Sequence, residues 1–203
     1  MGERELVQQA QAGDFEAFVK LVDSHKTKLY NLALKMTGNS LDAEDIVQET
    51  LMKAIDKIDQ FRGEASFGTW LYSIALNQTR AALVREKRTD LRPLEEYLPA
   101  NATHGEGNQH AHSHAQAFDW KDPHELLEQD ELRTAIDAAL TELPVKYREA
   151  FVLRYVDELS VKEVAGLIGE SVAATKSRIL RARVALRDHL SKVFEDRYGQ
   201  KMR

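Results

Sequence analysis

The chain contains no cysteine among its 203 residues. Disulfide bonds, cysteine-ligated zinc and thiol catalysis are therefore excluded. It also has no apolar run long enough to cross a membrane, and its N-terminus lacks the basic and then apolar segments of a secretion signal. We expect a cytosolic protein with no membrane span. Because strand-like alternation of apolar and polar residues is missing too, we expect an all-α fold.

A surplus of positive charge is also absent. The chain has 28 lysines and arginines against 33 acidic residues, a formal net charge of −5. Such a protein has no general attraction for nucleic acid. Any contact with DNA must come from local basic stripes.

The segment from 160 to 190 has the signals of two helices joined by a short turn. Ser160 and Glu163 form a capping box that predicts a helix starting at Val161. Gly169 suits the left-handed position just past the end of that helix, and Ser171 can cap the next one. This spacing is typical of a helix-turn-helix that places its second helix in a DNA groove.

The second of these helices carries clustered positive charge. Against a single Asp188 it has six basic residues: Lys176, Arg178, Arg181, Arg183, Arg187 and Lys192. Such a cluster favours contact with nucleic acid, although a solvated helix face is the alternative.

The first part of the chain has apolar residues at helical spacing throughout. We expect helices over 6–12 and 14–36, a third starting at Asp42 and a fourth from about Phe67, capped by Ser66. We interpret Trp70 as a hydrophobic-core residue of the fourth helix. In the last part we expect helices beginning at Asp122-Pro123 and over 144–156. The apolar face expected for the second helix is Phe15, Phe18, Val19, Val22, Leu29, Leu32 and Ala33.

Residues 93–121 are polar, contain proline and glycine, and show little periodicity. We interpret them as a flexible linker between two helical domains, 1–92 and 122–203. The linker carries closely spaced histidines. A metal site is one reading of them, but a flexible tract holds no ligand in place, so we predict no metal site. These histidines are His104, His110, His112 and His114.

Two further patterns bear on function. An acidic helix start at 42–50 offers three polar side chains on one face, and simple solvation of that face is the alternative. Residues 61–88 combine a loop with aromatic residues and a helix that becomes basic, which suits stacking on unpaired bases and clamping of phosphates.

Together these segments resemble the extracytoplasmic-function sigma factors, the smallest members of the sigma-70 family. DAEDIVQET resembles the polymerase-binding stretch, and FRGEASFGTWLYSIALNQTR the stretch that melts promoters and reads the −10 element. LPVKYREAFVLRYVDELSVKEVAGLIGESVAATKSRILRARVALR resembles the domain that binds the −35 element. The resemblance implies an alternative sigma factor, a protein without catalysis or cofactor.

The resemblance also implies roles for residues of the first domain. Those that would face the clamp helices of the polymerase β′ subunit are Asp45, Gln48 and Glu49. Those that would form the −10 site are Phe61 and Asn77 at the pocket for a flipped base, with Arg80, Arg85 and Arg88 on phosphates.

In the second domain, the positions that match −35 contacts are Lys176, Ser177, Arg178 and Arg181. The segment Ala173-Ala174-Thr175 departs from the family pattern Gly-Thr-Val. We expect Thr175, at a normally apolar buried position, to bond back to the Ser171 carbonyl. The partners implied are core RNA polymerase, through the β′ clamp helices and the β flap, promoter DNA and an anti-sigma factor.

Two other functions fit parts of the chain. A free-standing two-domain helix-turn-helix regulator would bind a palindrome without polymerase. A metal-responsive sensor would use the histidines of the linker.

Overall fold

The computed structural model describes residues 2–89 and 130–198, and every regular element in those ranges is a helix. This confirms the all-α prediction. The predicted linker, its four histidines and the helix start at Asp122 lie outside the described residues. None of the described helices is both long and apolar enough to span a bilayer.

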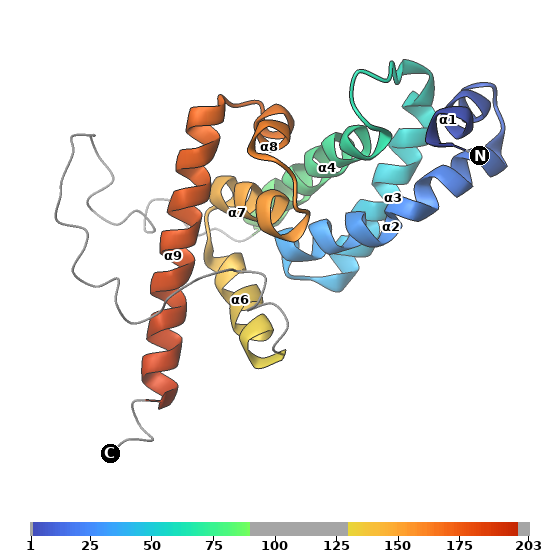
Figure 1. The fold of residues 1–203 in the computed structure, drawn as a ribbon. Coiled ribbons are helices and arrows are strands. Elements are labelled where there is room, and N and C mark those ends of the chain that lie inside the picture. The colour runs from blue at the N-terminus through green and yellow to red at the C-terminus, as the bar shows by residue number, and fades with distance from the viewer. Residues whose placement is uncertain (1, 90–129, 199–203) are drawn as a thin grey trace.

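Four α-helices form the first domain (Figure 1). They are α1 (Glu3–Gln11), α2 (Phe15–Thr37), α3 (Ser40–Lys57) and α4 (Phe67–Thr89), with a short 3₁₀ turn, η1 (Ile58–Gln60), after α3. Helices α2, α3 and α4 pack on one another because their apolar faces meet, and α1 covers the first half of α2.

The second domain begins with α6 (Asp130–Glu142) and α7 (Val145–Phe151). The helix predicted over 144–156 continues past α7 as a π turn, η3 (Val152–Val156). Then come α8 (Val161–Ile168) and the long α9 (Val172–Tyr198), which together form the helix-turn-helix (Figure 1).

The local signals of the helix-turn-helix are confirmed. The Ser160 hydroxyl accepts from the Glu163 amide at 3.3 Å, and the Glu163 carboxylate accepts from the Ser160 amide at 2.8 Å. Hydrogen bonding of the Glu163 carboxylate to the side chain and the backbone amide of Ser160 holds the pKa of Glu163 below its usual value. Thr175 is fully buried and its hydroxyl donates to the Ser171 carbonyl at 2.9 Å, as expected.

Two expectations differ from the structure. Phe15 and Val19 were expected on the buried face of α2 but are 63% and 39% exposed, because Ala17 and Phe18 form the inward face at the start of this helix. Helix α3 begins at Ser40, before the predicted Asp42. Asn39 caps it by accepting from the amides of Leu41 and Asp42, and that cap sets the earlier start.

The two domains pack against each other, which the sequence did not predict. The C-terminal half of α2 and the middle of α4 contact α6, α7, η3 and α8. One cluster of buried apolar side chains therefore runs through both domains, from Leu32 and Leu76 to Leu140 and Val164. We call this packed form the closed arrangement.

Gly38 marks how closely the domains approach. It ends α2 with φ of 73°, and a Cβ placed on it would lie 2.6 Å from Cγ2 of Thr141 on α6. Gly169 ends α8 with a similar φ of 71°, and nothing would lie within 4 Å of its Cβ. The two glycines share a backbone requirement, but only Gly38 has a neighbour in the other domain.

We predict that Gly169→Ala lowers the free energy of unfolding by about 1 kcal/mol, the cost of a left-handed alanine. Gly38→Ala should cost about 1 kcal/mol more, because its methyl group overlaps Thr141. Urea unfolding followed by circular dichroism measures both. Adding Thr141→Ser, which removes Cγ2, should make the two losses equal. Equal losses without that change would contradict the domain contact.

Candidate nucleic-acid and protein interfaces

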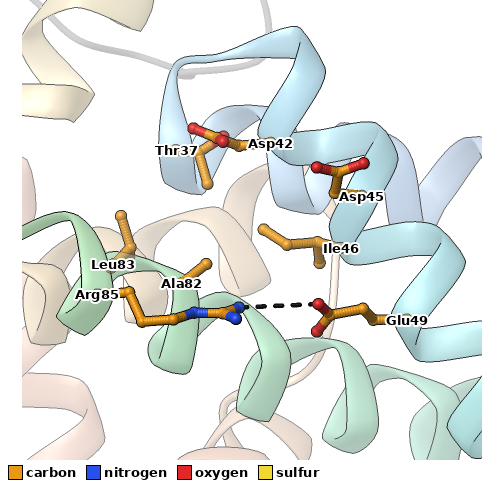
Figure 2. Close-up of a pocket in the computed structure, with 8 residues that line it drawn as sticks. All are labelled: Thr37, Asp42, Asp45, Ile46, Glu49, Ala82, Leu83 and Arg85. Atoms are coloured by element: carbon orange, nitrogen blue, oxygen red, sulfur yellow. Dashed lines mark ion pairs between the residues drawn. The ribbon is translucent and has the colours of Figure 1, made fainter.

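A groove of about 330 Å³ lies between the start of α3 and the end of α4. In Figure 2 the carboxylates of Asp42, Asp45 and Glu49 line the α3 side, and Arg85 reaches toward Glu49 from α4. The Glu49 and Arg85 side chains form an ion pair of 3.8 Å. The structure therefore brings two of the predicted polymerase-facing residues into one acidic groove, while Gln48 is exposed beside it.

Two exposed apolar side chains flank these acids, and the sequence analysis missed both. Leu41 is 70% exposed and Met52 is 67% exposed. Their spacing from Asp45 and Gln48 puts all four on one face of α3. A stripe in which polar side chains lie between two exposed apolar ones suits a protein partner better than solvent. Helical spacing alone could have found it, once the buried stripe had been assigned.

The loop before α4 is held by an aromatic cluster. The Phe61 ring lies 5.7 Å from Phe67 and 5.4 Å from Trp70, between ring centroids. Trp70 is partly buried against the hydrophobic core, in agreement with the interpretation made from the sequence. Gln11 fixes the same loop, because its side-chain amide donates to the carbonyls of Ile58 at 3.0 Å and Phe61 at 2.9 Å. No sequence pattern pointed to Gln11.

Asn77 is exposed on α4, seven residues after Trp70. Seven residues are about two helical turns, or about 10 Å along the axis. Phe61, which packs on Trp70, and Asn77 therefore lie on one side of the same helix at different heights. Arg80 shares the face of Asn77, and its guanidinium approaches the Asn77 side-chain oxygen at 3.5 Å.

The three arginines predicted to hold phosphates do not form one set. Arg80 forms an ion pair with Glu149 on α7 of the second domain. Arg85 follows five residues later, which turns it about 140° around the helix and into the acidic groove. Arg88 lies in the last turn of α4, and its side chain is outside the described residues.

The predicted −35 residues divide in the same way. Lys176, Ser177 and Arg181 are exposed on one face of α9. Arg178 points elsewhere, is 25% exposed and pairs with Glu170 in the turn of the helix-turn-helix. Leu180 is 60% exposed among the first three, and the sequence analysis did not select it. An apolar side chain at that place can contact a thymine methyl group.

Comparison with known proteins identifies the chain. Residues 21–89 match the family model for sigma-70 region 2, and residues 133–186 match the model for sigma-70 region 4. The chain is 39% identical over 184 residues to the ECF RNA polymerase sigma factor SigW of Bacillus subtilis. The aligned region covers 91% of this chain and 94% of SigW.

Two solved structures are similar over nearly the whole chain. CnrH in complex with the cytosolic domain of CnrY is 26% identical with a TM-score of 0.64, over 94% of this chain and 97% of CnrH. RpoE in complex with the anti-sigma factor NepR from Bartonella quintana is 26% identical with a TM-score of 0.59, over 88% and 97%.

These matches define the class of bacterial RNA polymerase sigma factors of the sigma-70 type. The chain belongs to the extracytoplasmic-function sigma factors, as the sequence resemblance implied. It is an alternative sigma factor for promoter-specific transcription initiation, and its family is not one of enzymes.

The different positions of Lys176 and Arg178 on α9 can be tested by stability measurements on the free protein. We predict that Arg178→Ala lowers the free energy of unfolding by about 1 kcal/mol, because it removes a partly buried ion pair. Lys176→Ala, which truncates an exposed cation on the same helix, should leave stability within about 0.5 kcal/mol. Urea unfolding compares the two variants. Equal effects would contradict the distinct positions assigned to these side chains.

Proposed function

We propose that this sigma factor binds core RNA polymerase through the exposed face of α3, reads the −10 element with α4 and reads the −35 element with α9. The observation that supports this most is the separation of charge on the surface. Acids gather on α3, exposed cations gather on one face of α9, and each lies in a segment matched by its own sigma-70 region.

The polymerase contact follows from the chemistry of α3. Asp45, Gln48 and Glu49 offer carboxylates and an amide to basic side chains on the clamp helices of the β′ subunit. Leu41 and Met52 add apolar area that becomes buried on binding. We expect the second domain to contact the β flap, as the family resemblance implies.

The promoter contacts divide by domain. On α4, Asn77 can donate to and accept from a base edge, and Arg80 can hold a phosphate. Phe61 supports the loop beside them. On α9, Lys176, Ser177 and Arg181 face DNA together, whereas Arg178 holds the turn through Glu170. Affinity for DNA should depend on the polymerase, because the chain carries a net charge of −5.

The remaining parts of the assignment are also proposals. We place the two domains at 1–92 and 122–203, with a linker at 93–121. Such a linker would let α4 and α9 contact the −10 and −35 elements of one promoter together. The chain recognises promoter DNA and positions the polymerase on it, and it performs no catalysis. It acts in the cytoplasm, where core polymerase transcribes. Because CnrH and RpoE are described in complexes with CnrY and an anti-sigma factor, we propose that a protein inhibitor also regulates this chain.

Run-off transcription tests the proposal. With core polymerase and a library randomised at both elements, the chain should enrich templates that carry one −35 and one −10 sequence at fixed spacing. Core polymerase alone is the control and should enrich none. If the chain instead selected a palindrome without polymerase, it would be a free-standing regulator and the proposal would be wrong.

Variants separate the two contacts in the same assay. Asp45→Lys should weaken binding to core polymerase at least tenfold, because it places a cation against the basic clamp helices. Asn77→Ala should leave that binding unchanged and lower transcription from the selected promoter about tenfold, the worth of one base contact. Equal losses of polymerase binding in both variants would contradict the assignment.

A further inference from the structure

The closed arrangement is held by polar contacts between the domains as well as by the shared hydrophobic core. Each pairs a group of the first domain with a group of the second. They are the ion pairs Lys35–Asp137 and Arg80–Glu149, a hydrogen bond of 2.9 Å from the Tyr72 hydroxyl to Asp157 Oδ1, and one from the Arg148 guanidinium to the Met36 carbonyl.

Glu149 is the most deeply buried of these acids. Its side chain is 4% exposed, and it receives Arg80 from α4 while Arg178 faces it from α9. A buried carboxylate needs cationic or hydrogen-bonding partners to offset its lost hydration. In the closed arrangement the Glu149 carboxylate therefore occupies the position on the Arg80 guanidinium where a phosphate oxygen would bind. If the domains separate, water solvates both groups and Arg80 becomes available.

Asp157, which follows η3, has only one of its two carboxylate oxygens hydrogen-bonded. Its Oδ1 accepts from Tyr72, but its Oδ2 is buried and has no hydrogen-bond partner. The groups that face it from the first domain are Tyr72 on α4 and Lys28 on α2. One hydrogen bond and one nearby cation offset only part of the cost of burying a negative charge, so the neutral acid fits this place better.

We propose that these contacts form a proton-dependent latch, in which Asp157 takes up a proton as the domains close and Glu149 keeps Arg80 from nucleic acid until they part. The latch itself rests on contacts between the domains. Its consequence for promoter binding rests on the proposed role of Arg80.

The electrostatics of these groups agree with the geometry. Burial raises the pKa of Asp157 to about 7, although the Tyr72 hydrogen bond and Lys28 oppose the shift. Burial also raises the pKa of Glu149, against Arg80 and Arg178. Burial and the neighbouring Asp157 raise the pKa of Tyr72, so its hydroxyl stays protonated and keeps donating.

The sign of the pH dependence follows. With the domains apart, Asp157 is solvated and its pKa returns to about 4. Closing then binds a proton, so the added stability of the closed arrangement is complete below about pH 4. It is lost as the pH rises through the pKa of about 7 in the closed arrangement.

Single-molecule energy transfer on the full chain tests the latch. Because the chain has no cysteine, dyes can be attached through Lys20→Cys on α2 and Ala185→Cys on α9, both exposed. We expect a closed population whose closing constant falls about tenfold between pH 6 and pH 8. A wild-type closing constant that is equal at the two pH values, or no closed population at either, would overturn the proposal.

Three variants serve as controls, each checked for folding by circular dichroism. Asp157→Asn keeps an oxygen that accepts from Tyr72 but cannot titrate, so its closing constant should be equal at pH 6 and pH 8. Tyr72→Phe removes the hydrogen bond between the domains and should lower the closing constant about fivefold at pH 6.

His25 is the third control. Burial lowers its pKa, and it packs on Phe67 within the first domain. His25→Gln should therefore keep the tenfold dependence. If Asp157→Asn kept that dependence, or His25→Gln lost it, the proton would be on another group and the latch would be wrong.

Discussion

The buried carboxylate of Glu149 is the interaction on which the arrangement of this molecule depends. It lies on α7, receives Arg80 from α4, and faces Arg178 on α9. Three helices from two domains therefore meet at one negative charge. Because a buried charge is stable only with its partners in place, the position of α9 and the closure of the domains are linked through this group.

In the closed arrangement the proposed binding surfaces on α3 and α9 are exposed, whereas Arg80 on α4 is paired with the second domain. Asp45 and Gln48 are exposed on α3, and Lys176 and Arg181 are exposed on α9. Arg80 is held by the second domain. The proposed polymerase-binding surface is therefore accessible before the domains part, whereas the proposed phosphate contact of Arg80 needs separation. A sigma factor with these properties would read its promoter only after it has engaged the enzyme, which agrees with its negative net charge.

The hydrogen bonds predicted correctly from the sequence join residues close together in the chain. The capping box of Ser160 and the back-bonded Thr175 were correct because each involves residues three or four apart, and the family resemblance supplied the functional segments. Contacts between distant residues were not predictable. Gln11 reaches Phe61 across 50 positions, Arg80 reaches Glu149 across 69, and Tyr72 reaches Asp157 across 85. Arg80 and Arg85 were therefore expected to act together, although helical rotation and the second domain separate them.

The most direct test of this account is to hold the domains closed and ask whether the protein still works. Lys35 and Asp137 form an ion pair between α2 and α6, so cysteines at these two positions lie within reach of a short, reducible bismaleimide. The account predicts that cross-linked protein fails in run-off transcription with core polymerase, and that cleavage of the linker by reductant restores the activity of the uncross-linked variant. Cross-linked protein that transcribes as well as the uncross-linked variant would contradict it.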